Sequence, residues 1–412
     1  MKCWILLVVL LGAAPPAADN WTEFRGPSGS GHSDAKNLPR EWSETKNVVW
    51  KAPLHGRGWS SPVVWGKKVW LTTATPEGKE LFVICVDRET GKVLMDAKLF
   101  DIAKPEETKK FNSFASPSPV IEEGRVYISF GSYGTACLNT ETGKPVWTRT
   151  DLTCNHWRGP GSSPILWQNL LILHFDGYDQ QYVVALDKKT GRTVWKSDRT
   201  HDFGTQDGDM KKAFSTPVVI EVGGKHLLIS PAAKAALALD VSTGKEVWRV
   251  TYGSHSVAAR PLVGHGMVYI GTGTGKDLVA VKPDGKGDVT KSHVAWTAKG
   301  FGHKPSGILV DDLIYGYPES GGLVTCIDAK TGEKVWAERV GATGHTASPL
   351  YADGVLYIFA EDGSAVMLQP GKEFKIVGRA KLEATEVCAT PAIAGSSIFY
   401  RTNTHLYRIE NR

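Results

Sequence analysis

The sequence predicts an all-β fold: an eight-bladed β-propeller of four-stranded antiparallel blades, closed by an N-terminal strand in the last blade. Two phrases that recur along the chain predict it, together with a last unit that lacks one strand. The 412 residues include 44 glycines and 22 prolines, spread at intervals rather than gathered in one linker. That distribution is typical of many short strands joined by tight turns.

The first phrase marks the start of each unit. Ser or Thr precedes Pro and a β-rich run, and proline at the first residue of a strand costs the sheet little because the ladder loses only one end donor. Seven good copies and one degenerate copy occur, at Ser61-Pro62, Ser118-Pro119, Ser163-Pro164, Thr216-Pro217, Arg260-Pro261, Ser348-Pro349 and Thr390-Pro391, with Ser306-Gly307 as the degenerate one.

The second phrase is Asp-x-x-Thr-Gly-Lys followed by Val-Trp, which predicts a capped hairpin turn. Asp or Asn caps the turn through its side chain, Gly adopts positive φ, and Val-Trp begins the next strand. A Trp at the same place in successive units suits packing between neighbouring sheets. Copies begin at Asp87, Asn139, Asp187, Asp240 and Asp328, and weaker ones occupy 283–286 and 370–372.

Each unit holds four expected strands, for example 218–220, 226–230, 235–239 and 246–250. Units recur about every 40 to 55 residues, the spacing of propeller blades. The last unit ends after its third strand, at 406–409, and residues 47–52 can supply the fourth. Closure of the ring in this way would remove exposed sheet edges.

The N-terminus is typical of an export signal. Lys2 precedes an apolar stretch, 4–11, and small residues lead to Ala17-Ala18. Because a membrane-spanning helix needs roughly 20 apolar residues, we expect residues 1–18 to be a cleaved signal peptide, with an uncleaved anchor as the alternative. Residues 19–412 would then form a single propeller domain, with 19–46 as a lead-in, in the periplasm or secreted.

Charge and cysteine content exclude some classes of function. The net charge of +5 is spread along the chain with no long basic run, so nucleic-acid binding is not expected. The five cysteines of the mature chain lack the spacing of a disulfide framework or zinc site. Cys85, Cys137 and Cys326 occupy the same place in their repeats, where other repeats have Ala, so we expect these three to be packed thiols. The other two are Cys154 and Cys388. We expect a monomer without a transmembrane anchor.

The Asp-x-x-Thr-Gly-Lys-x-Val-Trp phrase resembles the repeat of the pyrroloquinoline-quinone (PQQ) type propellers, over about residues 42–412. This superfamily includes quinoprotein dehydrogenases and BamB, an outer-membrane assembly lipoprotein. The opening segment from Trp21 to Gly31 resembles the start of many secreted bacterial PQQ-like proteins. The dehydrogenases hold PQQ with calcium and carry two adjacent cysteines, which are absent here. We therefore expect no cofactor, with PQQ and calcium as the alternative.

The loops that enter each unit carry six of the twelve histidines: His55, His156, His201, His255, His303 and His345. In a propeller these loops share one face and surround a central funnel. Tryptophan rings there can stack on a ligand, and arginines can bind carboxylate or phosphate in bidentate fashion. The candidate ligand-binding residues are His55, Arg57, Trp59, His156, Trp157, Arg158, His255, Arg260, His303, Lys304 and His345.

Three interpretations of this funnel remain open. It can bind a small anionic or sugar-like ligand or a peptide strand; its polar residues can simply face water, as loop residues often do; or its histidines can converge on a metal, although no His-x-His or His-x3-His pair supports this. The leading hypothesis is an exported, non-catalytic scaffold that binds a protein partner or a small polar ligand, as BamB does in assembly. The alternatives are a quinoprotein-type or metal-dependent oxidoreductase with its site in the same funnel, and a carbohydrate-active enzyme that uses facing carboxylates.

Overall fold

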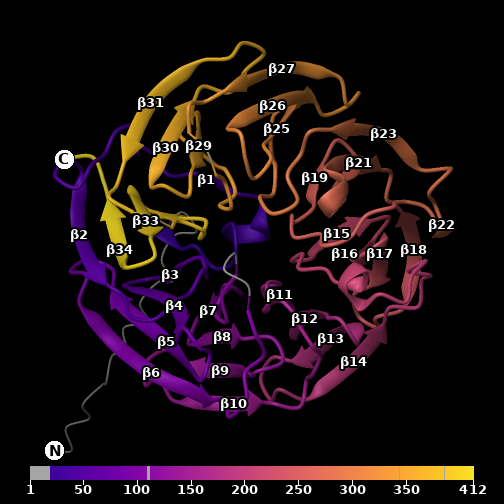
Figure 1. The fold of residues 1–412 in the computed structure, drawn as a ribbon, viewed down its shortest axis with the longest axis horizontal. Helices are drawn as coiled ribbons and strands as arrows, with labels where there is room; N and C mark the ends of the chain where they lie inside the picture. The colour runs from indigo at the N-terminus through magenta and orange to yellow at the C-terminus, as the bar shows by residue number, and fades with distance from the viewer. Residues whose placement is uncertain (1–18, 109–111, 343, 385) are drawn as a thin grey trace, which may run out of the picture.

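The computed structural model describes residues 19–108, 112–342, 344–384 and 386–412, and it shows eight sheets arranged around a central axis (Figure 1). The expected signal peptide, 1–18, lies outside the described residues. Each sheet contains the four antiparallel strands that the repeats predict, so the eight-bladed propeller is confirmed. Among the described residues, no helix is long and apolar enough to cross a membrane.

The first four blades run from the axis outward in chain order. They comprise β3 (Val63–Trp65), β4 (Lys68–Ala74), β5 (Glu80–Asp87) and β6 (Val93–Asp101); β7 (Val120–Glu122), β8 (Arg125–Ser129), β9 (Thr135–Asn139) and β10 (Pro145–Arg149); β11 (Ile165–Trp167), β12 (Leu170–Asp176), β13 (Gln181–Asp187) and β14 (Thr193–Asp198); and β15 (Val218–Val222), β16 (Lys225–Pro231), β17 (Ala235–Asp240) and β18 (Glu246–Thr251), whose outer edge pairs with β22 (Gly287–Asp288).

The remaining blades repeat the pattern. They comprise β19 (Leu262–Gly264), β20 (Met267–Gly271), β21 (Asp277–Val281) and β23 (Val294–Lys299); β24 (Ile308–Val310), β25 (Leu313–Gly316), β26 (Leu323–Asp328) and β27 (Lys334–Arg339); β28 (Leu350–Ala352), β29 (Val355–Phe359), β30 (Ser364–Leu368) and β31 (Ile376–Lys381); and β32 (Ala392–Ala394), β33 (Ser397–Arg401), β34 (His405–Ile409) and β2 (Val48–Pro53). Short 3-10 turns are η2 (Pro27–Gly29), η3 (Gly208–Lys211) and η4 (Gly273–Gly275).

The last blade takes its fourth strand from the N-terminal part of the chain, as the sequence predicts. Strand β2 pairs antiparallel with β34, in a register that places Val48 opposite Ile409 and Pro53 opposite His405. The lead-in makes a second, unexpected contact: β1 (His32–Ser33) pairs in parallel with β28 at the inner edge of the seventh blade. The N-terminal segment therefore touches the ring at both its rim and its centre (Figure 1).

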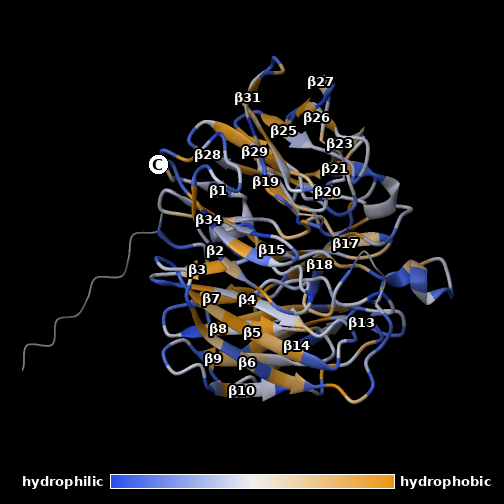
Figure 2. Ribbon diagram, turned by 60° about the vertical axis from the view of Figure 1, so that its left-hand side comes forward, coloured by the Kyte–Doolittle hydropathy of each residue, from blue (hydrophilic) through white to orange (hydrophobic). Residues whose placement is uncertain are grey.

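The core lies between neighbouring sheets. Apolar side chains of β5, such as Leu81 and Val83, pack against Ile128 and Ala136 of the next blade. Figure 2 shows apolar residues concentrated on the strands and polar residues on the loops. This alternation of sheet and apolar layer continues around the ring, so every blade depends on both neighbours.

The repeated tryptophans form an outer tryptophan ring that links the blades, which confirms their expected place at the interfaces. Each indole N–H donates to a backbone carbonyl of the next blade: Trp50 to Arg88 (3.0 Å), Trp147 to Lys188 (3.0 Å), Trp195 to Val241 (3.1 Å), Trp248 to Pro283 (2.8 Å), Trp296 to Lys330 (3.1 Å) and Trp336 to Gly371 (3.1 Å). Four of these indoles, those of Trp50, Trp147, Trp195 and Trp296, also cover a turn glycine of that blade; a Cβ at Gly191 would lie 2.7 Å from the Trp147 ring.

The turn chemistry of the second phrase is confirmed as well. In the first blade, Asp87 Oδ1 accepts hydrogen bonds from the backbone N–H groups of Glu89 and Thr90 and from the Thr90 hydroxyl. Gly91 follows at φ 73°. Acceptance of three donors by one carboxylate oxygen fixes the hairpin that joins the third strand to the fourth.

Candidate functional site

The Ser/Thr-Pro starts bring a ring of hydroxyls to the axis, here called the hydroxyl belt. At six of the eight unit starts, the backbone N–H donates to the hydroxyl of the next blade. The links are Ser61 to Ser118 (2.9 Å), Ser118 to Ser163 (2.9 Å), Ser163 to Thr216 (3.0 Å), Arg260 to Ser306 (2.9 Å), Ser306 to Ser348 (3.0 Å) and Ser348 to Thr390 (2.9 Å). Arg260 interrupts the belt because it offers no hydroxyl to the preceding blade.

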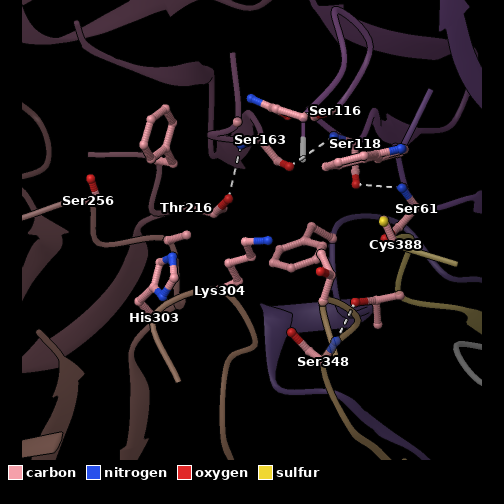
Figure 3. Close-up of a pocket in the computed structure, with 18 of the residues that line it drawn as sticks. Ser61, Ser116, Ser118, Ser163, Thr216, Ser256, His303, Lys304, Ser348 and Cys388 are labelled. Carbon is pink, nitrogen blue, oxygen red and sulfur yellow. Dashed lines mark hydrogen bonds between the residues drawn. The ribbon is translucent and has the colours of Figure 1, made fainter. Parts of the chain in front are cut away.

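The belt encloses a pocket of about 450 Å³ on the face of the unit-entry loops (Figure 3). Six belt hydroxyl residues line it: Ser61, Ser118, Ser163, Thr216, Ser348 and Thr390. Trp59, Phe214 and Phe24 contribute aromatic surface, and Asn112 contributes an amide. The volume suits a small molecule rather than a folded partner.

The lead-in, from Trp21 to Gly31 and here called the plug, reaches the pocket. Phe24 lines the pocket, and Arg260 holds the plug from the fifth blade. The Arg260 guanidinium is buried; it donates to the Phe24 carbonyl (2.8 Å) and the Pro217 carbonyl (3.1 Å) and pairs with Glu23 (2.9 Å). A Cβ at Gly29 would lie 1.8 Å from Arg260 Nη1, so this plug position requires glycine.

Glu23 stays buried beside this arginine. Burial raises the pKa of the Glu23 carboxyl above its ordinary value, although the charge and hydrogen bond of Arg260 act in the opposite direction. The pair fastens the plug to the blade that lacks the belt hydroxyl. Arg260, a candidate ligand-binding residue, therefore binds the plug and does not line the pocket.

Two basic side chains lie in the pocket wall. Arg158 lies in the loop before β11 and pairs with Asp209 (2.7 Å), which also pairs with the buried Lys212. Lys304 lies in the loop before β24, and Figure 3 shows its amine pointing toward the middle of the pocket. Neither aspartate nor glutamate occurs among the described residues that line the pocket.

A carboxylate stands behind this wall and fixes two of its residues. Glu319 Oε1 lies 2.6 Å from His303 Nδ1 and accepts the backbone N–H of Lys304 (2.9 Å). Burial would raise the pKa of Glu319, but its contacts with His303 and the Lys304 amide outweigh that effect and lower the pKa to about 2. Glu319 is thus an ionised support for the loop.

Five of the candidate residues are brought together at the pocket: Trp59, Arg158, His255, His303 and Lys304. His255 sits beside Thr274 of η4, and burial together with the charge of Lys234 lowers its pKa. Arg57 is not among the lining residues but contacts one of them: its guanidinium lies over the Trp59 ring (5.3 Å to the centroid) and pairs with Glu386 (3.0 Å).

The other candidates lie elsewhere. His55 is exposed and bonds to Asp96 (2.9 Å), and Trp157 is exposed against Tyr178, with ring centroids 5.2 Å apart. His156 is buried and accepts the Ser132 N–H (2.9 Å). His345 is fully buried and donates from Nδ1 to the Phe359 carbonyl (2.8 Å). The unit-entry histidines thus serve different local roles, and only His255 and His303 are among the described residues that line the pocket.

The donor set of the pocket does not fit calcium-bound PQQ. Calcium takes six to eight oxygen ligands, with carboxylates prominent among them. The described lining residues supply hydroxyls and one amide but no carboxylate, and Cys388 is their single cysteine. Within the described parts of the chain, no three His, Cys, Asp or Glu side chains are grouped closely enough to hold a metal ion. A pair of facing carboxylates, as glycoside hydrolysis requires, is also not found among these lining residues.

Several residues that line the pocket were not predicted from the sequence: the belt hydroxyls, Asn112, Phe214, Cys388 and Phe24. The belt had a visible signal, because Ser or Thr preceded nearly every unit-opening proline. We assigned those positions a role at the strand start and did not consider that eightfold repetition places them on the axis. Phe24 carried no such signal, since nothing in the lead-in indicates that it folds back into the ring.

Comparisons with known proteins agree with this architecture. A family model described as outer membrane protein assembly factor BamB matches residues 32–197, 179–299 and 277–371. No curated protein matches the sequence. Solved structures with a similar fold include quinohemoprotein alcohol dehydrogenase from Comamonas testosteroni (TM-score 0.68, 12% identity, 96% of this chain and 81% of that one) and BamB from Moraxella catarrhalis (TM-score 0.60, 14% identity, 89% and 97%).

A europium-containing methanol dehydrogenase is similar to the same degree, with a TM-score of 0.65 and 11% identity over 94% of this chain and 90% of that one. At such identities the structural likeness shows the fold alone. The family match covers well over half of the chain and coincides with the repeats that build the blades. The chain therefore belongs to the PQQ-type, BamB-like family of β-propeller repeat proteins.

Proposed function

We propose that the protein is an exported, non-catalytic binding propeller whose axial pocket takes a small anionic, sugar-like molecule. The observation that carries this proposal is the composition of the pocket: Arg158 and Lys304 among hydroxyls, with no carboxylate among the described lining residues. An acidic group on a ligand would meet charge-assisted donors there. The rest of a polyol could exchange hydrogen bonds with the belt.

The aromatic side chains support the same class of ligand. Trp59 lines the pocket. The Arg57 guanidinium lies over the Trp59 ring and is itself paired with Glu386. An indole fixed in this way offers a flat apolar surface on which the C–H face of a sugar ring can pack. Phe24 and Phe214 extend that surface around the pocket.

Cys388 provides a reporter for occupancy of the pocket. Its side chain lies beside Ser61 in the pocket, whereas Cys85, Cys137, Cys154 and Cys326 are buried in the blades (Figure 3). Burial raises the pKa of the Cys388 thiol, so alkylation should be slow near neutral pH and faster at pH 8.5. A molecule that fills the pocket should slow this alkylation.

The experiment compares D-glucuronate and D-gluconate with neutral D-glucose, by calorimetric titration and by the rate of N-ethylmaleimide labelling of Cys388. We expect the acidic sugars to bind and to protect the thiol. Lys304→Met should weaken their binding about tenfold, because it removes a charged hydrogen-bond donor worth about 1.4 kcal/mol. The control is Lys330→Met, an exposed lysine that pairs with Asp312 away from the pocket.

Equal binding of glucose and glucuronate would contradict the charge argument, and failure of every panel member to bind or to protect Cys388 would overturn the proposal. A stoichiometric chromophore after incubation with PQQ and calcium would instead favour the oxidoreductase alternative.

A second candidate function, docking of a protein partner, is favoured by one observation. Trp157 and Tyr178 form an exposed aromatic pair, and Trp157 is held at φ 61°, a conformation that non-glycine residues rarely adopt. The export of the chain, inferred from residues 1–18, would place such a surface in the periplasm or outside the cell. Trp157→Ala should then abolish recovery of a reproducible partner from periplasmic extract without changing sugar binding.

A further inference from the structure

Arg25, in the middle of the plug, is a fully buried arginine with few partners. Its Nη2 donates to the Ser30 carbonyl (3.0 Å). Its Nε and Nη1 atoms have no hydrogen-bond partner among the described residues, and no carboxylate of those residues forms an ion pair with it. Because a guanidinium offers five N–H donors, most of its bonding capacity is unused.

The charges around Arg25 leave an excess of one positive charge. The charge of Arg260 acts on Arg25, and Arg260 is already paired with Glu23. Burial, and then the charge of Arg260, lower the pKa of Arg25 to about 9, although the nearby Tyr317 phenol acts in the opposite direction. Arg25 therefore remains protonated at neutral pH, and the plug contains two buried guanidinium groups for one carboxylate.

A buried charge of this kind calls for a counter-ion. Buried charges in proteins are ordinarily paired, because desolvation of an isolated ion costs several kcal/mol. Water could satisfy the free N–H groups but would not neutralise the cation. The guanidinium is fully buried, and Gly31 packs closely against its Nη2 side, where a Cβ would lie 2.7 Å away. A small anion fits these requirements better than a carboxylate ligand.

We propose that a small inorganic anion, chloride under ordinary conditions, binds the N–H groups of the Arg25 guanidinium that have no partner among the described residues and completes the plug. The site is separate from the axial pocket, which Arg25 does not line, and it does not depend on the proposed sugar ligand. Its role is structural: the anion supplies the second negative charge that lets two arginines share the centre of the ring.

The direct test is crystallography of the full chain purified and crystallised in sodium bromide. We expect one anomalous peak of bromide within hydrogen-bond distance of Arg25 Nε or Nη1. Density for water alone at that position, with no anomalous signal, would overturn the proposal. This measurement uses the native sequence, so it stands even if variants of Arg25 fail to fold.

The second test is thermal unfolding in sodium chloride and in sodium gluconate at equal ionic strength. Chloride should raise the Tm by about 3 °C in a saturable manner, as for a ligand that binds the folded state alone. Arg25→Met should remove this difference, whereas Arg149→Met, which changes an arginine paired with Asp151 at the surface, should keep it. Equal Tm values in the two salts for the native chain would contradict chloride binding.

Discussion

The outer tryptophan ring and the hydroxyl belt repeat the same device at opposite ends of the blades, yet they tolerate change differently. At the rim, Met95 replaces the tryptophan in the first blade and still covers the turn glycine Gly143. At the axis, Arg260 stands in place of the Ser or Thr and donates a hydrogen bond to the Phe24 carbonyl of the plug. A rim side chain contacts its own blade and the next one, whereas an axial side chain also faces the lead-in at the centre of the ring, so a single departure there creates a new contact.

The largest effect is expected at the rim, for Trp248→Ala. Trp248 is fully buried, and its loss removes a large side chain and leaves the Pro283 carbonyl without its donor. We expect a loss of about 3 to 5 kcal/mol in the free energy of unfolding, measured in urea. Trp248→Phe, which retains most of the volume, should cost about 1 to 2 kcal/mol. Equal losses in both variants would show that the hydrogen bond, not the packing, dominates.

Arg260→Ser tests whether the arginine that interrupts the belt stabilises the plug. The variant restores the repeat, but it leaves the Glu23 carboxylate buried without its cation, and we expect it to cost about 3 kcal/mol. The pKa of Glu23, already raised by burial, would rise further. The folded state would then hold a proton that the unfolded chain releases, so the variant should lose stability as pH rises from about 4 toward neutral.

Glu23→Gln in the Arg260→Ser background is the matching control. It removes the buried charge, so it should recover part of the lost stability at pH 7 and flatten the pH dependence, both read from urea unfolding at several pH values. A fully stable Arg260→Ser protein would mean that the plug is held by its other contacts, such as the backbone hydrogen bonds between Trp21 and Val64.

The same contrast explains how much the sequence could predict. Rim features are local: Asp87 and its turn lie within a few residues of one another, and the strand count follows from the repeats, so the fold, the closure by β2 and the interblade tryptophans were all predictable. Axial features join residues far apart in the chain. Lys304 and Arg158 could be placed on one face because both lie in unit-entry loops. The contacts of Arg260 could not be predicted, because they involve Glu23, 237 residues earlier, in a lead-in that contains no repeat.

Ser118→Ala and Ser61→Ala form a matched pair that sharpens the role of the belt. The Ser118 hydroxyl accepts the buried N–H of Ser61, so its removal should cost about 1 to 3 kcal/mol. The Ser61 hydroxyl accepts no belt N–H among the described residues, and we expect Ser61→Ala to change stability by less than about 0.5 kcal/mol. Chemical denaturation of both variants measures the difference. Similar losses for the two would show that the belt is not a chain of directional links.

The smallest effect concerns the rim turns and their response to acid. Hydrogen bonds from the Thr90 hydroxyl and backbone lower the pKa of Asp87, and burial opposes them only in part. Because the folded-state pKa lies below the unfolded value, the carboxylate adds stability above about pH 4 that is lost as pH falls through the folded-state pKa. Asn139 accepts the equivalent bonds in the second blade without a charge.

Asp87→Asn should therefore leave stability at pH 7 within about 0.5 kcal/mol of the native value and reduce its decline between pH 5 and pH 2. Asp87→Ala, which removes the acceptor, should cost about 1 kcal/mol at pH 7. Urea midpoints at both ends of this pH range distinguish the two. If Asn proved as damaging as Ala, the charge of Asp87 and not its acceptor geometry would hold the turn, and the neutral copy at Asn139 would need support from elsewhere in its blade.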